Sequence, residues 1–279
     1  MKISSTPHVH TTYVDGQACA EAMVLGALDR GFTSLGFSEH ARQSVDPDYG
    51  MTLSSERAYL REIPMLREKY RGRIRIHMGV EMDQYALCAK EPYEYVIGSV
   101  HYLPDEEGVT AVDESREALL ELRKRRYHDR GDLLAAAYFR AVAEHALALR
   151  PHICGHFDLI RKYNGANCIY DASMPAVQSA ALEALEAVRE SGAMLEINTG
   201  GMARGRTASP YPERYLLRRW RELGGNVIIS SDAHQPEHLD FAFDVALAMA
   251  QEAGFDHIWM LGNEGEDTFV ERSCTNGKS

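Results

Sequence analysis

Short runs typical of β-strands alternate with runs of helical period along almost the whole chain, and this alternation limits the fold most strongly. The strand-like runs end near seven positions, which are His8, Ser38, Val80, Val100, Gly155, Ile197 and Ser230. Helical stretches are expected between them, at about 18–30, 54–70, 115–126, 133–149, 174–190, 213–223 and 239–253. Strands that are each followed by a helix pair in parallel. Seven such units favour a closed or nearly closed barrel over an open sheet, a choice that periodicity leaves open.

Composition and charge narrow the class of protein. The 279 residues are 45% hydrophobic and 25% charged, as in ordinary globular proteins, and we expect one catalytic domain over 1–263 and a polar, frayed tail over 264–279. The net charge of −11 argues against a broad nucleic-acid surface. Because no apolar run reaches membrane-spanning length and Met1–Pro7 lacks an apolar signal core, we expect a cytoplasmic protein with no membrane span. The oligomeric state stays open.

Polar side chains follow every predicted strand at its carboxyl end. They are His8, His10 and Asp15, then Glu39 and His40, Glu81, His101, His156 and Asp158, Asn198 and Thr199, and finally Asp232 and His234. In a parallel barrel these ends converge on one face, which is where the active sites of such barrels lie. The spacing of His8 and His10 places both imidazoles on the same side of an extended strand.

This set of residues indicates a metal cluster. Imidazole and carboxylate ligands suit Zn, Fe or Mn, and the set exceeds the needs of one tetrahedral ion. We therefore expect two to three divalent transition-metal ions, with Glu81 as a candidate bridge. The remaining histidines are interpreted as surface or packing residues; they are His77, His128, His145, His152, His238 and His257. The sequence contains no Walker-type loop, no Gly-rich dinucleotide turn and no GxSxG elbow.

The same residues resemble the motif series of the polymerase-and-histidinol-phosphatase (PHP) superfamily. The motifs are His8-Val9-His10, Asp15, Glu39-His40, Gly79-Val80-Glu81, Gly98-Ser99-Val100-His101, Gly155-His156-Phe157-Asp158 and Ser231-Asp232-Ala233-His234. Three further segments resemble the stand-alone L-histidinol-phosphate phosphatases, namely 155–163 (GHFDLIRKY), 195–201 (LEINTGG) and 210–212. The match runs in order from about His8 to His234.

This resemblance implies an α/β fold, a distorted, TIM-barrel-like (βα)7 barrel with its active site at the carboxyl ends of the strands. It also implies a trinuclear centre. One ion would be held by His8, His10, Glu81 and Asp232, a second by Glu81, His101 and His156, and a third by Asp15, His40 and His234. The chain departs from the family pattern at Asp15, where some members carry histidine, and at Ser38-Glu39-His40, where many read Thr-Asp-His.

The implied activity is a metal-dependent phosphomonoesterase, a histidinol-phosphatase of L-histidine biosynthesis, in which a metal-activated hydroxide attacks phosphorus. Its partner is a small phosphate monoester. The residues expected to take part in catalysis are Glu81, Asp158, Asp232 and His234. The candidates for binding the phosphate or the rest of the substrate are Arg161, Lys162, Asn198, Arg204 and Arg206.

Some assignments remain open at this stage. Asp158 could orient His156 or bind the amino end of the substrate. The alternatives to a histidinol-phosphatase are a phosphoesterase that acts on nucleotides or oligonucleotide ends, and a catalytically inactive metal-binding domain. Long nucleic acid is disfavoured, because the chain has no basic stretch lined with aromatic residues.

Overall fold

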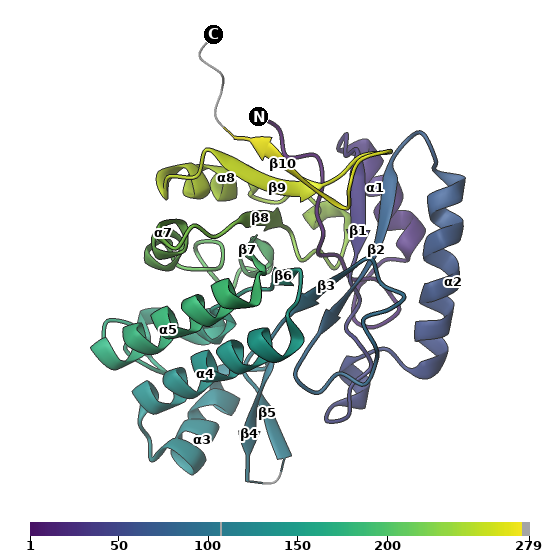
Figure 1. Ribbon diagram of the computed structural model, residues 1–279. Helices are drawn as coiled ribbons and strands as arrows, with labels where there is room; N and C mark the ends of the chain where they lie inside the picture. Colours follow the sequence, from purple (N-terminus) through teal and green to yellow (C-terminus); the bar gives the residue numbers. More distant parts are fainter. Residues whose placement is uncertain (107, 275–279) are drawn as a thin grey trace.

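A largely parallel sheet forms the centre of the computed structural model, which describes residues 1–106 and 108–274 (Figure 1). Its eight strands follow the order β1-β2-β3-β6-β7-β8-β9-β10 and are parallel up to β9, whereas β10 is antiparallel. Their bounds are Ser34–Phe37, Arg75–Met82, Tyr95–Gly98, Ile153–Cys154, Met194–Asn198, Val227–Ser230, His257–Leu261 and Phe269–Ser273.

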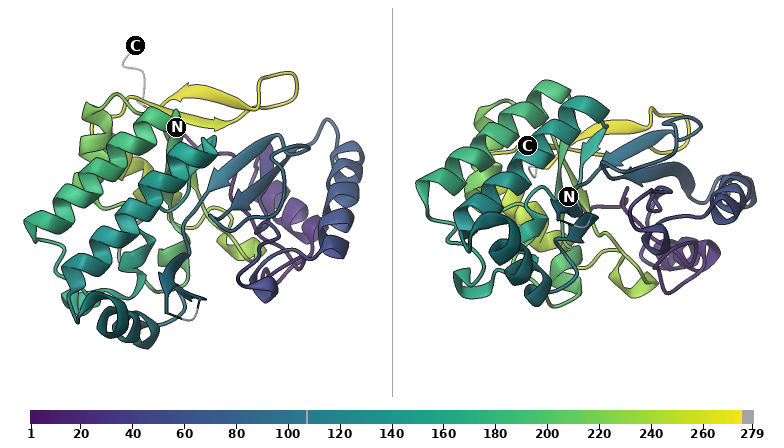
Figure 2. Two further views of the ribbon diagram at one scale, coloured as in Figure 1. Left: turned by 60° about the horizontal axis from the view of Figure 1, so that its bottom comes forward. Right: turned by 90° about the horizontal axis from the view of Figure 1, so that it is seen from below.

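Helices connect the strands and cover the outside of the sheet (Figures 1 and 2). The main ones are α1 (Ala20–Asp29), α2 (Leu53–Lys69), α3 (Arg116–Tyr127), α4 (Gly131–Leu149), α5 (Pro175–Ser191), α7 (Arg214–Glu222) and α8 (Phe243–Glu252). They agree with the predicted helical stretches to within a few residues at most ends. The short helical turns are α6 (Gly200–Ala203), η1 (Pro47–Tyr49), η2 (Leu159–Tyr163), η3 (Gly165–Asn167) and η4 (Pro236–His238). No helix among the described residues is both long and apolar enough to cross a membrane.

The N-terminal segment, predicted as the first strand of the barrel, lies between β1 and the end of β8. It forms no regular strand, but its backbone bonds to both sides. The amide of Gly36 in β1 donates to the carbonyl of Thr6 (2.9 Å), and the amide of His10 donates to the carbonyl of Ala233 beyond β8 (2.9 Å). The fold is therefore the predicted α/β arrangement of parallel strands and helices, and no continuous strand ladder closes it into a barrel within the described residues.

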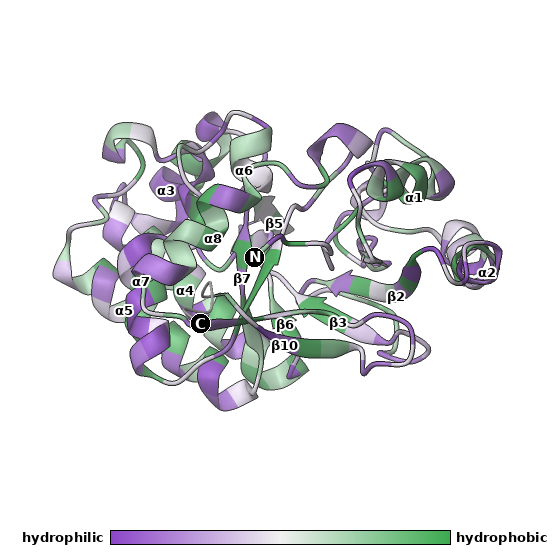
Figure 3. Ribbon diagram, turned by 90° about the horizontal axis from the view of Figure 1, so that it is seen from above, coloured by the Kyte–Doolittle hydropathy of each residue, from purple (hydrophilic) through white to green (hydrophobic). Residues whose placement is uncertain are grey.

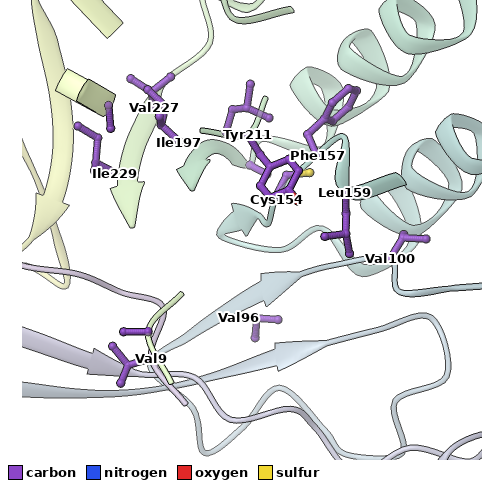
Figure 4. Close-up of a cluster of buried hydrophobic side chains, with 14 of the residues drawn as sticks. Val9, Val96, Val100, Cys154, Phe157, Leu159, Ile197, Tyr211, Val227 and Ile229 are labelled. Carbon is purple, nitrogen blue, oxygen red and sulfur yellow. The ribbon is translucent and has the colours of Figure 1, made fainter. Parts of the chain in front are cut away.

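The strands follow the two-residue alternation of side chains, which separates two packed clusters. Tyr95 and Ile97 of β3 belong to a small apolar cluster, whereas Val96 between them packs in the large cluster that includes the covering helices. Figure 4 shows members of the large cluster, among them Val96, Ile197 and Phe157. Hydrophobic residues accordingly gather along the strands, and hydrophilic residues mark the outer faces of helices such as α2 and α7 (Figure 3).

Gly79 in the predicted Gly-Val-Glu motif makes room for a tyrosine. A Cβ atom at position 79 would lie 2.3 Å from the ring of Tyr95, closer than side-chain atoms pack. The hydroxyl of Tyr95 reaches the carbonyl oxygens of Pro7 and Phe37 (2.9 Å for Phe37) and so ties β3 to β1 and to the residue before His8. The glycine therefore supports the position of the N-terminal segment, which carries two of the predicted metal ligands.

Two regions differ from what the sequence predicts. The expected frayed tail is instead strand β10, antiparallel to β9 with Phe269 opposite Leu261; Phe269 packs its ring against Tyr95 at 5.7 Å. This strand escapes sequence analysis because polar residues dominate it. Residues 275–279 of the predicted tail lie outside the described residues. The charged and irregular sequence from 103 to 118 also predicts a surface excursion, but this stretch contains most of the hairpin of β4 (Tyr102–Asp105) and β5 (Gly108–Ala111), and α3 begins at Arg116.

Candidate metal centre

The carboxyl ends of the strands surround one cavity of about 140 Å³. Its wall consists of Asp15, His40, Tyr49, Glu81, His101, Asp113, His156, Leu159, Lys162, Arg204, Asp232 and His234. Seven of the nine residues that the sequence predicts as metal ligands are in this wall. The other two, His8 and His10, are fully buried and contact the carboxylates of the wall from behind. The structure thus brings together side chains that span more than 200 positions of the chain.

Glu81 lies at the middle of the cluster, at the end of β2, and one of its oxygens faces three imidazoles. Its Oε2 atom is 2.9 Å from Nδ1 of His40, 3.4 Å from Nε2 of His8 and 3.5 Å from Nε2 of His10. The parallel bridge between positions 40 and 81 sets this approach, because it places the end of β2 beside the residue that follows β1. One carboxylate oxygen is therefore available to the histidines of two different segments.

The second oxygen of Glu81 faces the opposite side of the cluster. Its Oε1 atom is 3.0 Å from Nε2 of His156 and 3.7 Å from Nε2 of His101. Burial raises the pKa of Glu81, but His8, His40 and His101 outweigh that effect and hold it well below its ordinary value. The carboxylate is consequently ionised and can offer one oxygen to each side, as a bridging ligand requires.

Asp232 and Asp15 complete the cluster on its other side. Oδ1 of Asp232 is 3.5 Å from Nε2 of His10, and Oδ2 of Asp15 is 3.0 Å from Nε2 of His234. Potential ligand atoms within 4.8 Å of one another form four overlapping groups, namely His10-Asp15-His40-His234, His8-His10-Asp232, His8-Glu81-His156 and His40-Glu81-His101. The first group contains the whole set that the resemblance assigns to the third ion.

Unpaired buried atoms indicate that this cluster suits cations. Nε2 of His8, Nε2 of His10, Nε2 of His40 and Oε2 of Glu81 are all buried without a hydrogen-bond partner, which is costly unless another species satisfies them. Burial lowers the pKa of His8, yet neighbouring carboxylates, with Glu196 the strongest, raise it well above its ordinary value. The surroundings of His8 Nε2 therefore favour positive charge, and the donor set of nitrogen and oxygen fits Zn, Fe or Mn.

Glu196 in β7 supports the cluster from beneath, and sequence analysis did not single it out. Its Oε1 atom accepts a hydrogen bond from Nδ1 of His8 (2.6 Å), and its Oε2 atom accepts one from the backbone amide of His156 (2.6 Å). The alternation of β7 contains the signal for this role, because Glu196 shares a strand face with Asn198, the predicted site residue two positions later. Such outer partners fix the tautomer and orientation of ligating histidines.

Asp83 plays a comparable part for His101. Its Oδ2 atom accepts from the backbone amide of His101 (2.7 Å) and lies 3.3 Å from Nδ1 of the same ring. Asp83 directly follows β2 and comes two positions after Glu81, so the strand-end pattern that marks Glu81 extends to it, although sequence analysis did not select it.

Two of the predicted phosphate-binding residues are in the cavity wall. Arg204 donates to Oδ2 of Asp232 (2.8 Å) and to its backbone carbonyl (3.1 Å). Lys162 forms an ion pair with Oδ2 of Asp113 at 2.9 Å. Both cations therefore adjoin the cluster, and each is already paired with a carboxylate.

Arg161 and Arg206 are outside the cavity wall. Arg161 is engaged by Asp158 (3.0 Å) and by the backbone carbonyls of Ser209 (3.1 Å) and Pro210. Arg206 is exposed, with its guanidinium 5.6 Å from the ring centre of Tyr163. Sequence position alone did not separate these arginines from Arg204, because all three follow strands that end at the site.

Asn198 and Asp158 are buried close to the cluster but do not line the cavity. Asn198 donates to Oε2 of Glu196 (2.9 Å) and lies 3.4 Å from Oδ2 of Asp232. Asp158 accepts from Arg161 and from the backbone amide of Glu213 (2.9 Å), and its burial raises its pKa. Within the described residues, no hydrogen bond joins the Asp158 carboxylate to the ring of His156.

Three cavity residues, Tyr49, Asp113 and Leu159, are not among the site residues that the sequence predicts. Tyr49 from η1 packs its ring against His40 at 4.6 Å between centroids, and Leu159 begins η2. Asp113 belongs to the segment between β5 and α3. These side chains line the cavity together with the proposed metal ligands.

Comparisons with known proteins agree with this architecture. The PHP domain model matches residues 7–200. A relative from Deinococcus radiodurans, named probable histidinol-phosphatase, is 30% identical over 240 residues, covering 82% of this chain and 85% of the relative. The histidinol-phosphatase of Bacillus subtilis is 27% identical over 79% of this chain and 89% of its own length.

A solved structure shares the fold. The histidinol phosphate phosphatase of Lactococcus lactis, crystallised with zinc, L-histidinol and phosphate, superposes with a TM-score of 0.70 at 22% identity, covering 92% of this chain and 96% of that one. The family model matches well over half of the chain, and the Deinococcus radiodurans relative is similar along most of its length. The chain therefore belongs to the PHP domain family.

Proposed function

We propose that this protein is a metal-dependent phosphomonoesterase, a histidinol-phosphatase that converts L-histidinol phosphate and water to L-histidinol and phosphate in L-histidine biosynthesis. The observation that carries the proposal is the Glu81 carboxylate in the cavity wall, whose two oxygens each face a different set of imidazoles. Membership of the family and the names of the similar proteins support the substrate.

The proposed metal ligands are the nine residues His8, His10, Asp15, His40, Glu81, His101, His156, Asp232 and His234. When bound, two to three divalent ions supply a water of pKa near 7 and neutralise charge on the phosphoryl oxygens. The chain itself supplies the ionised bridge at Glu81 and the outer carboxylates that orient His8 and His101. Phosphate monoester hydrolysis is extremely slow without such help, since enzymes accelerate it by up to about 10²¹-fold.

The charges in the wall explain why cations are needed for an anionic substrate. Four carboxylates, those of Asp15, Glu81, Asp113 and Asp232, share the cavity with one lysine, one arginine and four imidazoles among the described residues. When the imidazoles are neutral, as metal ligands must be, such a wall repels a phosphate dianion, and divalent ions would reverse the local sign. We assign Arg204 to the phosphate because its guanidinium lies beside Asp232 in the cavity wall and offers several N–H donors in a rigid, planar arrangement.

An assay of phosphate release tests the proposal directly. The metal-loaded protein is given L-histidinol phosphate, nucleoside monophosphates and short DNA with terminal phosphates, at equal concentrations. We expect kcat/KM to be highest for L-histidinol phosphate. A preference for the nucleotide substrates would move the chain to another activity of the same site, and no turnover of any phosphoester by metal-replete protein would indicate an inactive metal-binding domain.

A further inference from the structure

The segment between β5 and α3 carries a carboxylate into the cavity wall, where no proposed metal ligand explains it. Asp113 lines the cavity, and its side chain is only 13% exposed. The backbone amide of Val112 donates to the carbonyl of His101 (2.7 Å), which fixes this segment directly beside the metal cluster. Burial raises the pKa of the Asp113 carboxyl, but Lys162 and then His101 outweigh that effect and hold the pKa below its ordinary value.

The Asp113 carboxylate has an accepting oxygen to spare. Its Oδ2 atom takes the ammonium of Lys162 at 2.9 Å. No donor within the described part of the chain reaches its Oδ1 atom at hydrogen-bonding distance. Unlike the other three carboxylates of the wall, Asp113 belongs to none of the groups whose atoms cluster closely enough to share an ion.

A negative side chain at this place opposes the binding of a phosphate dianion. Lys162 neutralises the charge of Asp113. If pairing with Lys162 were the only role of Asp113, however, the carboxylate would make that lysine unavailable to the phosphate. The arrangement is favourable if the substrate itself carries a positive group next to its phosphate. L-Histidinol phosphate does so, because its ammonium is on the carbon adjacent to the CH₂ that bears the phosphate ester.

We propose that Asp113 binds the ammonium of the substrate and thereby selects phosphomonoesters of amino alcohols over uncharged counterparts. The inference rests on the proposed function and adds the residue that sets its specificity. The ammonium and the phosphate are only two carbons apart, so the recognising carboxylate has to adjoin the metal cluster, as Asp113 does. Asp158, the candidate from the sequence, does not line the cavity and is engaged by Arg161 and the amide of Glu213.

Paired substrates test this role. The kcat/KM of the metal-loaded protein is measured for L-histidinol phosphate and for the analogue in which hydrogen replaces the amino group. We expect the wild-type protein to prefer the amino substrate by about 10- to 100-fold, the range for a hydrogen bond to a charged group. Asp113→Asn should lose most of that preference, because its kcat/KM should fall for the amino substrate and stay unchanged for the analogue. Asp113→Glu should retain part of the preference.

Glu114→Gln is the matched control. Glu114 is the next residue after Asp113 and carries the same charge, but its side chain is exposed and lies outside the cavity wall. This variant should keep the wild-type preference. If Asp113→Asn lowers both substrates equally, Asp113 only holds the loop and Lys162, and the inference is wrong. It is equally wrong if the wild-type protein shows no preference.

Binding of the product separates this inference from the proposed function. Calorimetry on metal-loaded protein compares L-histidinol with the corresponding alcohol that lacks the amino group. If neither phosphate is hydrolysed, the proposed function fails, but tighter binding of L-histidinol that Asp113→Asn abolishes would still support the role of Asp113. Equal binding of the two alcohols by the wild-type protein would overturn it.

Discussion

Substituting Glu196 by glutamine tests whether an outer carboxylate positions the metal cluster. Oε1 of Glu196 accepts from Nδ1 of His8 (2.6 Å) and from the Ser230 hydroxyl, and its Oε2 atom accepts from the amide of His156 (2.6 Å) and from Asn198 (2.9 Å). An amide has the same shape but only one accepting end. If its NH₂ group faces the amide of His156 and Asn198, two hydrogen bonds to a fully buried carboxylate are lost. If it faces His8 and Ser230 instead, both of these groups must accept rather than donate.

The expected magnitude follows from these contacts. Two hydrogen bonds to a charged acceptor contribute about 1.5 kcal/mol each at the low end, so the metal-free Glu196→Gln protein should be less stable by about 3 kcal/mol. If the NH₂ faces His8, the Nδ1 atom must accept and the proton moves to Nε2, where it blocks a metal. We therefore expect metal affinity to fall by roughly 10- to 100-fold, as for other outer partners of ligating histidines.

Chelator competition and urea unfolding measure the two effects. Glu186→Gln is the control, because Glu186 is an exposed helix residue that pairs with Arg219 at 3.2 Å, and exposed pairs contribute about 0–1 kcal/mol. The control should match the wild-type protein in both assays. Wild-type metal affinity in Glu196→Gln would refute the view that this carboxylate sets the tautomer and orientation of His8.

Two other changes have clear expected results. Glu81→Ala should lower metal content, measured by elemental analysis, from the two to three ions expected in the wild-type protein. It should also reduce turnover by more than about 100-fold, because loss of even an outer partner of a metal ligand costs about 10- to 100-fold. Retained activity in this variant would show that the bridge is wrongly assigned. Burial lowers the pKa of His77 to about 4 from an ordinary 6.5. The unfolded chain therefore binds more protons between these values, so stability is lost as pH falls from 6.5 to 4, by up to about 3 kcal/mol. Urea unfolding of metal-free His77→Gln should show a smaller loss over that range than the wild-type protein, and equal pH slopes would contradict this cause.

Local patterns were sufficient to predict most of the strand ends around the cavity and the residues that gather there. His8, Glu81 and Asp232 are far apart in sequence, but each follows a run whose period marks a strand, and parallel strands bring their carboxyl ends to one edge. The sequence also predicted most helices to within a few residues, because the helical period of their apolar residues is a local signal. The cavity and its cluster of potential ligands follow from these short-range features.

Partners of buried charges depended on the tertiary structure. The contact of His8 with Glu196 joins residues 188 positions apart, and that of Lys162 with Asp113 joins residues 49 positions apart. The fold alone decided that Arg161 pairs with Asp158 whereas Arg204 lies beside the cluster. It also decided that the N-terminal segment, rather than a regular strand, joins β1 to the end of β8. A charged side chain takes its role from the groups that packing places within a few ångströms, and no periodicity along the chain encodes those neighbours.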